Sequence, residues 1–113
     1  MSFTSLHPLF RPWAQALYVG SERAGLSPRI TSTYRSFREQ SILFDRRARV
    51  LRGELPPSAQ PFPVAPPGGS RHNFRAAFDM VVNPGGERVV GPVWQSWGGF
   101  WTSTDRIHFG DVG

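Results

Sequence analysis

The sequence predicts an α+β fold in which helices flank a small antiparallel sheet. Three observations support this class. Apolar residues recur at helical spacing in two segments, short β-branched or apolar segments suit strands, and one stretch is too rich in Pro for either. The chain has 113 residues, 39% of them hydrophobic, including nine Phe and four Trp. This size and composition suit a single domain over residues 1–113 and exclude a disordered polypeptide.

Two helices are expected in the first half of the chain. The first covers residues 7–24, with apolar side chains at helical spacing and Gly25 as its stop. The second covers about residues 37–52 and starts at a capping box, because Ser36 can accept from the backbone of Glu39 while the Glu39 side chain reaches back. One face of this second helix is apolar and holds Phe37, Phe44, Ala48 and Leu51.

Three segments are expected to be strands. Residues 29–33 are short and β-branched, and residues 76–82 are typical of a strand buried on both faces that carries one charge, Asp79. Residues 105–109 form a final strand. A short helix is expected over residues 93–97, and a Gly-broken aromatic segment follows it.

Residues 54–69 contain six prolines and two glycines, a density that no helix or central strand tolerates. A linker between two domains is one interpretation, but too little chain lies on either side for two cores. We therefore expect a long surface loop that leads into a site.

The composition limits the chemistry that the chain can perform. It has no cysteine, which excludes disulfides and thiolate zinc sites, so a metal would need His nitrogens and carboxylate oxygens. The three histidines are His7, His72 and His108, and His7 suits a helix start. The net charge of +5 would attract a polyanion, but no recognised nucleic-acid motif accompanies it, so no nucleic-acid partner is expected.

Asp79 is unusual because a carboxylate inside an apolar strand needs an ion partner or a metal. His72 lies seven residues upstream, just after the Pro-rich loop, and the loop and strand could fold back to bring both side chains to one ion. An ion pair with one of the many arginines would explain Asp79 equally well.

Asp105 and His108 form a second pair near the end of the chain. A His with a nearby carboxylate is what metal-assisted hydrolysis needs, because one group can bind the metal while the other takes a proton from water. Two His and one carboxylate as ligands would leave an open position, which is typical of catalytic zinc.

Three motifs resemble the family of zinc D-alanyl-D-alanine carboxypeptidases and L-alanyl-D-glutamate endopeptidases, which includes VanY-type enzymes and several phage endolysins. The S-x-H-x-x-G-x-A-x-D run is matched by residues 70–79. The T/S-x-Y-R-S segment, followed by Gln, is matched by residues 31–36 with Gln40. The W-G-G segment leading to D/E-x-x-H-F is matched by residues 97–99 and 105–109. They occur in the family's order and span about residues 6–110.

The resemblance implies a hedgehog/DD-peptidase-like zinc peptidase fold and assigns a role to each matched residue. His72, Asp79 and His108 would bind Zn2+, and Asp105 would be the general base. Arg35 would be the cation near the scissile carbonyl or a substrate carboxylate.

The implied reaction is hydrolysis of a bond in peptidoglycan stem peptides, of either the carboxypeptidase or the endopeptidase type. Three further residues are candidates for binding the substrate: Ser70, Tyr34 and Trp97. Ser70 could instead orient its loop, and Trp97 could instead form part of the cleft wall.

Two positions depart from the family pattern. Arg75 replaces the motif Gly, so the backbone there would be strained if it needs a positive φ. Phe100 stands where many relatives have a polar residue, and we expect it to shape the cleft. Arg75 keeps a second hypothesis open, in which the chain is a catalytically impaired module that binds cell wall without cutting it.

The first residues lack a basic segment followed by an apolar run, so no signal peptide is recognised, and no stretch is apolar for long enough to span a membrane. We expect a monomer that does not insert into membranes. It would act on the cell wall, either as a protein that stays cytoplasmic until it is released, as phage lysins do, or as part of a virion. A bacterial enzyme exported by another route is a further alternative.

Overall fold

A computed structural model describes residues 3–83 and 85–111. The elements follow the chain as η1 (Phe3–Ser5), α1 (Arg11–Arg23), β1 (Ser27–Ser32), α2 (Phe37–Leu51), η2 (Pro57–Ala59), η3 (Arg71–Phe74), β2 (Ala77–Asn83), α3 (Glu87–Ser96), β3 (Phe100–Thr102) and β4 (Asp105–Gly110), where η marks a short 3-10 helix. The predicted α+β class is confirmed.

The four strands form one antiparallel sheet in the order β1-β2-β4-β3. β2 is central, and its Asp79 lies opposite Ser32 of β1 and opposite His108 of β4. This register makes Asp79 and His108 neighbours, although 29 positions separate them in the sequence.

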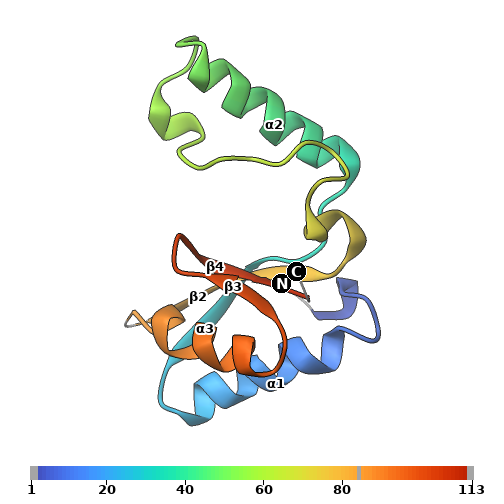
Figure 1. The fold of residues 1–113 in the computed structure, drawn as a ribbon, viewed down its shortest axis with the longest axis vertical. Coiled ribbons are helices and arrows are strands. Elements are labelled where there is room, and N and C mark those ends of the chain that lie inside the picture. Colours follow the sequence, from blue (N-terminus) through green and yellow to red (C-terminus); the bar gives the residue numbers. More distant parts are fainter. Residues whose placement is uncertain (1–2, 84, 112–113) are drawn as a thin grey trace.

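One face of the sheet is covered by α1 and α3, which both lie below it in Figure 1. Phe78, Met80 and Val82 of β2 point to this side and are fully buried. They pack with residues of α1 and α3 in a single aromatic-rich core, in which Phe78 contacts both Trp94 and Phe109. This packing follows from the period of a strand, since alternate side chains of β2 share one face.

The other face of β2 carries Ala77, which is buried, and Asp79 and Val81, which are only partly buried. The prediction that this strand is buried on both faces is therefore only half confirmed. Neither α1 nor α3 covers this second face, and in the described part of the chain a cleft lies there instead. The sequence could not separate the two cases, because Ala, Met and Val suit either environment.

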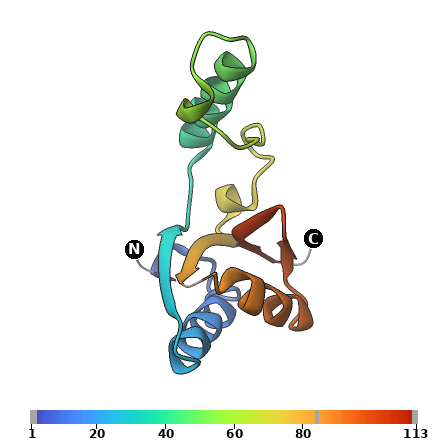
Figure 2. The same cartoon turned by 90° about the vertical axis from the view of Figure 1, so that its left-hand side faces the viewer.

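Residues 36–69 form an arm that projects from the opposite side of the sheet to α1 and α3 (Figures 1 and 2). The capping box is confirmed, because Glu39 N donates to Ser36 Oγ at 3.1 Å and Ser36 N donates to Glu39 Oε1 at 3.3 Å. The Pro-rich segment then folds back along α2. Gln40 Nε2 donates to Ala65 O at 2.8 Å, and this hydrogen bond holds the returning segment against α2.

The apolar face of α2 that the sequence shows is not its packed face. Phe37 is 52% exposed and Leu51 is 71% exposed, whereas Gln40 is buried. The helix packs through Gln40 and Leu43 because these side chains face the returning Pro-rich segment.

Two further boundaries differ from prediction. α1 begins at Arg11 rather than residue 7, with Pro12 in its first turn, where a missing N–H is tolerated. α3 covers Glu87–Ser96, although only residues 93–97 were expected to be helical, because Gly91 and Pro92 weaken its helical signal. No helix in the described part of the chain is both long and apolar enough to cross a membrane.

Candidate metal centre

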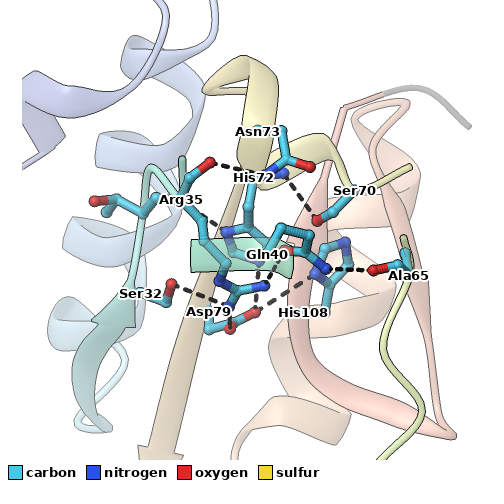
Figure 3. Close-up of polar contacts among 10 residues, drawn as sticks. Ser32, Arg35, Gln40, Ala65, Ser70, His72, Asn73, Asp79 and His108 are labelled. Carbon is cyan, nitrogen blue, oxygen red and sulfur yellow. Dashed lines mark hydrogen bonds and ion pairs between the residues drawn. The ribbon is translucent and has the colours of Figure 1, made fainter. Parts of the chain in front are cut away.

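Three side chains from three separate elements converge at one point on the open face of the sheet (Figure 3). They are His72 of η3, Asp79 of β2 and His108 of β4, and their candidate ligand atoms all lie within 4.8 Å of one another. Asp79 Oδ1 is 3.1 Å from His72 Nε2 and 3.5 Å from His108 Nδ1. The structure thus brings together the three residues predicted as metal ligands.

Local folding explains how His72 reaches this point. Ser70 caps η3, because its Oγ accepts from His72 N at 3.3 Å, so the chain turns tightly just before β2. The buried His72 ring then places Nδ1 2.7 Å from the carbonyl oxygen of Thr33. A carbonyl oxygen only accepts, so Nδ1 carries a hydrogen. Nε2 faces Asp79: in the charged ring it donates a hydrogen bond to that carboxylate, and in the neutral ring it presents a lone pair that can bind a metal.

This arrangement favours a cation at the centre. A lone pair on Nε2 and a carboxylate oxygen repel each other at 3.1 Å unless a proton or a metal ion lies between them. Two imidazole nitrogens and one carboxylate oxygen form a donor set of catalytic zinc, which leaves a position for water or substrate. The residues present therefore fit zinc.

Asp79 is held in its charged form. Burial would raise the pKa of the Asp79 carboxyl, but hydrogen bonds from His108 and His72, together with the charges of these rings, outweigh burial and lower the pKa well below its ordinary value. An ionised carboxylate is the form that binds a metal.

A cleft of about 790 Å³ lies over the three side chains, between the sheet and the arm. Asp105, the first residue of β4, lines this cleft together with Ser70 and is exposed to solvent. Asp105 is not part of the group of ligand atoms, so its carboxylate is available for another role. The wall on the arm side includes the polar residues Gln40 and Gln60 and an apolar set, Leu43, Phe62, Pro63, Val64 and Ala65.

Arg35 also lines the cleft and is held at several points. Its Nη1 donates to Gln40 Oε1 at 2.9 Å, and its Nη2 lies 3.9 Å from Asp79 Oδ2. Its backbone N donates to the carbonyl oxygen of His72 at 3.0 Å. These contacts aim the guanidinium at the same region as the candidate ligands (Figure 3).

Asn73 is a residue of the centre that the sequence did not single out. It is buried, and its Nδ2 donates to Arg35 O at 2.8 Å while its Oδ1 accepts from Gly68 N at 3.1 Å. Asn73 therefore ties the segment of Arg35 and the end of the Pro-rich loop to the turn that carries His72. A polar residue directly after a metal-ligand candidate was the available signal.

Tyr34 and Trp97 do not line this cleft. The Tyr34 ring is exposed and lies under the guanidinium of Arg75, whose Cζ is 4.6 Å from the ring centre. Trp97 lines a separate hollow of about 570 Å³ with Trp13 and His7. Their predicted roles in substrate binding remain predictions.

Phe100 lies at the edge of the candidate centre, with its ring centre 6.4 Å from that of His108. At Arg75 the backbone has a φ of 63°, so this side chain occupies the left-handed region that glycine adopts readily. The expectation of a strained backbone at Arg75 is confirmed.

Comparison with known proteins agrees with this geometry. A sequence profile of the VanY family, described as D-alanyl-D-alanine carboxypeptidase, matches residues 4–90. No curated protein sequence matches the chain.

Solved structures share the fold. The vancomycin resistance D,D-pentapeptidase VanY, as an E175A mutant in complex with Zn(II), is 21% identical with a TM-score of 0.72, over 96% of this chain and 73% of that one. VanYB in complex with D-alanine-D-alanine is 20% identical with a TM-score of 0.73, over 96% and 72%. The L,D-carboxypeptidase DacB from Streptococcus pneumonia is 20% identical with a TM-score of 0.66, over 96% and 67%.

Proposed function

The chain belongs to the VanY family of D-alanyl-D-alanine carboxypeptidases, which are peptidoglycan peptidases, and from this we propose that it is a zinc-dependent hydrolase of peptide bonds in peptidoglycan stem peptides. The observation that carries the proposal is the convergence of His72, Asp79 and His108, whose candidate ligand atoms lie within 4.8 Å of one another. The solved relative with Zn(II) and the one with D-alanine-D-alanine support the choice of metal and of substrate class.

We assign the three convergent residues to the metal. His72 and His108 would each give an imidazole nitrogen and Asp79 a carboxylate oxygen. A bound zinc ion would supply a Lewis acid that polarises the scissile carbonyl and lowers the pKa of water to about 7. The Thr33 carbonyl holds the hydrogen of the neutral His72 ring at Nδ1, which leaves Nε2 as the nitrogen that would bind a metal.

Asp105 is the proposed general base. Its carboxylate lines the cleft and is exposed, so it can accept a proton from the attacking water and later deliver that proton to the leaving amine. A base outside the ligand set keeps this proton transfer separate from metal binding.

Arg35 is the proposed stabiliser of negative charge. Addition of water to a peptide carbonyl places a negative charge on oxygen, and a fixed guanidinium nearby stabilises that oxyanion. Gln40 and the backbone of His72 hold Arg35 in place, so little reorganisation accompanies the reaction.

Two substitutions test these assignments. Asp105→Ala should retain about one zinc per chain by elemental analysis but lose cleavage by at least about 100-fold, because general-base catalysis contributes about 10²–10⁴-fold. His72→Ala should lose the metal itself. Wild-type turnover by Asp105→Ala would remove Asp105 as base, and undiminished zinc affinity in His72→Ala would remove His72 from the ligands.

The reaction products identify the bond that is cut. Digestion of defined muropeptides, with the fragments weighed by mass spectrometry, separates loss of a terminal D-Ala from cleavage between L-Ala and D-Glu. No fragments from any muropeptide in the presence of zinc would contradict the proposed hydrolase.

A second candidate function is cell-wall binding without cleavage. The positive φ of Arg75 favours it, because strain in the turn directly after His72 can move that ligand. Retention on purified peptidoglycan without released fragments would support the binding module over the hydrolase.

A further inference from the structure

Three guanidinium groups line the cleft, and two of them already have partners. Arg35 is held by Gln40 and Asp79. The Nε of Arg71 donates to Asp111 in an ion pair. The third is Arg106 of β4, for which the described residues provide no ion pair or side-chain hydrogen bond, and its side chain is exposed.

The backbone at Arg106 is firmly anchored. Trp101 Nε1 donates to Arg106 O at 2.8 Å, and the Trp101 ring is buried against Gly91. A Cβ at Gly91 would lie only 2.2 Å from that ring, so the indole fits with no space to spare. The guanidinium of Arg106 therefore extends from a fixed point, which lowers the entropy lost when it binds a ligand.

The position of Arg106 directs this cation to the substrate. It lies two residues before His108 on β4, so the two side chains share a face of the strand, and both line the cleft. A group that pairs with Arg106 therefore lies on the same side of the sheet as the candidate ligands. Guanidinium forms two parallel hydrogen bonds with a carboxylate, and stem peptides are rich in carboxylates.

Charge in the cleft favours the same partner. The cleft is lined by three arginines and two carboxylates, Asp79 and Asp105, so its lining carries an excess of positive charge. Arg35 and Arg71 already have carboxylate partners, which leaves Arg106 as the cation for a substrate carboxylate. A cleft with this excess of positive charge attracts anionic substrates over neutral ones.

We propose that Arg106 determines specificity by binding a free carboxylate of the stem peptide beside the scissile bond. The enzyme would then discriminate against stem peptides in which that carboxylate is amidated. This inference rests on the proposed peptidase function and adds to it the substrate group that the cleft selects.

The test uses stem peptides that differ only in one carboxylate. In each member of the set one group is a carboxamide: the free carboxyl of the second residue, the side-chain carboxyl of the third, or the C-terminal carboxyl. The zinc-loaded wild type is compared with Arg106→Gln and Arg106→Lys. Arg88→Gln serves as matched control, because Arg88 is exposed on α3, outside the cleft, and the change removes the same charge.

For one of the three carboxylates, we expect wild-type kcat/KM to fall about 10- to 100-fold on amidation, the range for a charge-assisted hydrogen bond. Arg106→Gln should cut the free and amidated peptides at nearly equal rates, Arg106→Lys should keep part of the preference, and Arg88→Gln should keep all of it. Zinc content should be unchanged.

Equal cleavage of all peptides by the wild type would overturn the role of Arg106 and leave the peptidase function standing. The role would also be overturned if Arg106→Gln kept the wild-type preference. Absence of cleavage of every peptide by the zinc-loaded wild type would instead contradict the proposed function itself, and this inference with it.

Discussion

Arg75 combines an unfavourable backbone with a favourable side-chain contact. Its φ of 63° costs about 1 kcal/mol relative to glycine, while its guanidinium over the exposed Tyr34 ring returns about 0.5–1 kcal/mol. The two effects nearly offset each other, which explains how a turn next to a candidate ligand tolerates this residue.

Substitutions at Arg75 can separate the two effects. Arg75→Ala keeps the strained backbone and loses the ring contact, whereas Arg75→Gly removes both. We expect Arg75→Gly to exceed Arg75→Ala in free energy of unfolding by about 1 kcal/mol, measured by chemical denaturation. Equal stability of the two variants would mean that the turn is not strained at this position.

The candidate ligands could be predicted from the sequence, but their supports could not. His72, Asp79 and His108 were named because a spaced motif preserves residue types that the metal requires. Asn73 bonds to the backbone carbonyl of Arg35 and to the backbone N–H of Gly68. Almost every residue has these two groups, so the sequence does not show which of them Asn73 contacts. Only the folded structure shows which backbone groups lie within hydrogen-bond distance of the Asn73 side chain.

At the scale of elements, the arm is the part whose stability depends most on interactions between residues close in the sequence. Gln40 is the only residue of α2 that is buried, so little tertiary packing stabilises this helix. The capping box at its start therefore contributes a larger share of its stability. This contrasts with α1 and α3, which share the aromatic core with β2.

Removal of the cap should therefore loosen the arm alone. We expect Ser36→Ala to cost about 1 kcal/mol of local helix stability and to speed amide hydrogen exchange in α2, with the exchange of β2 and β4 unchanged. Exchange measured by mass spectrometry resolves these segments. Faster exchange throughout the sheet would show that the arm and the sheet unfold as one unit.

Element prediction succeeded where a local rule decides and failed where packing decides. The start of α2 was predicted to the residue because a capping box is a local signal. The first half of α3 and the whole of β3 were missed, since Gly91 and the Gly98-Gly99 pair argue against regular structure. Both glycine sites instead admit an indole, of Trp101 and of Trp94, where a Cβ would lie within 2.2 Å of the ring.

At the scale of the whole molecule, the candidate centre joins three segments that lie apart in the sequence. η3, β2 and β4 each contribute one candidate ligand. The arm projects away from the sheet (Figure 2), and several of its residues line the cleft over these side chains. A metal that binds all three therefore stabilises the folded chain and not the unfolded one.

Zinc should raise the unfolding temperature of the protein. At about 100 times its dissociation constant, a single bound ion adds about 2.7 kcal/mol, and a chelator should remove this gain. His72→Ala should abolish the zinc-dependent shift, whereas His7→Ala should retain it, because His7 lies outside the ligand group. A full shift in His72→Ala would place zinc elsewhere.

The strand order β1-β2-β4-β3 makes β4 the strand that completes the candidate centre. β4 follows β3 in the chain, yet it lies between β2 and β3 and carries both His108 and Asp105. Without β4, β3 has no strand to pair with among those that the structure describes, and the candidate centre lacks one of its three ligands. Closure of the sheet and assembly of the proposed metal site therefore depend on the same strand, so a change that displaces β4 should disrupt both together.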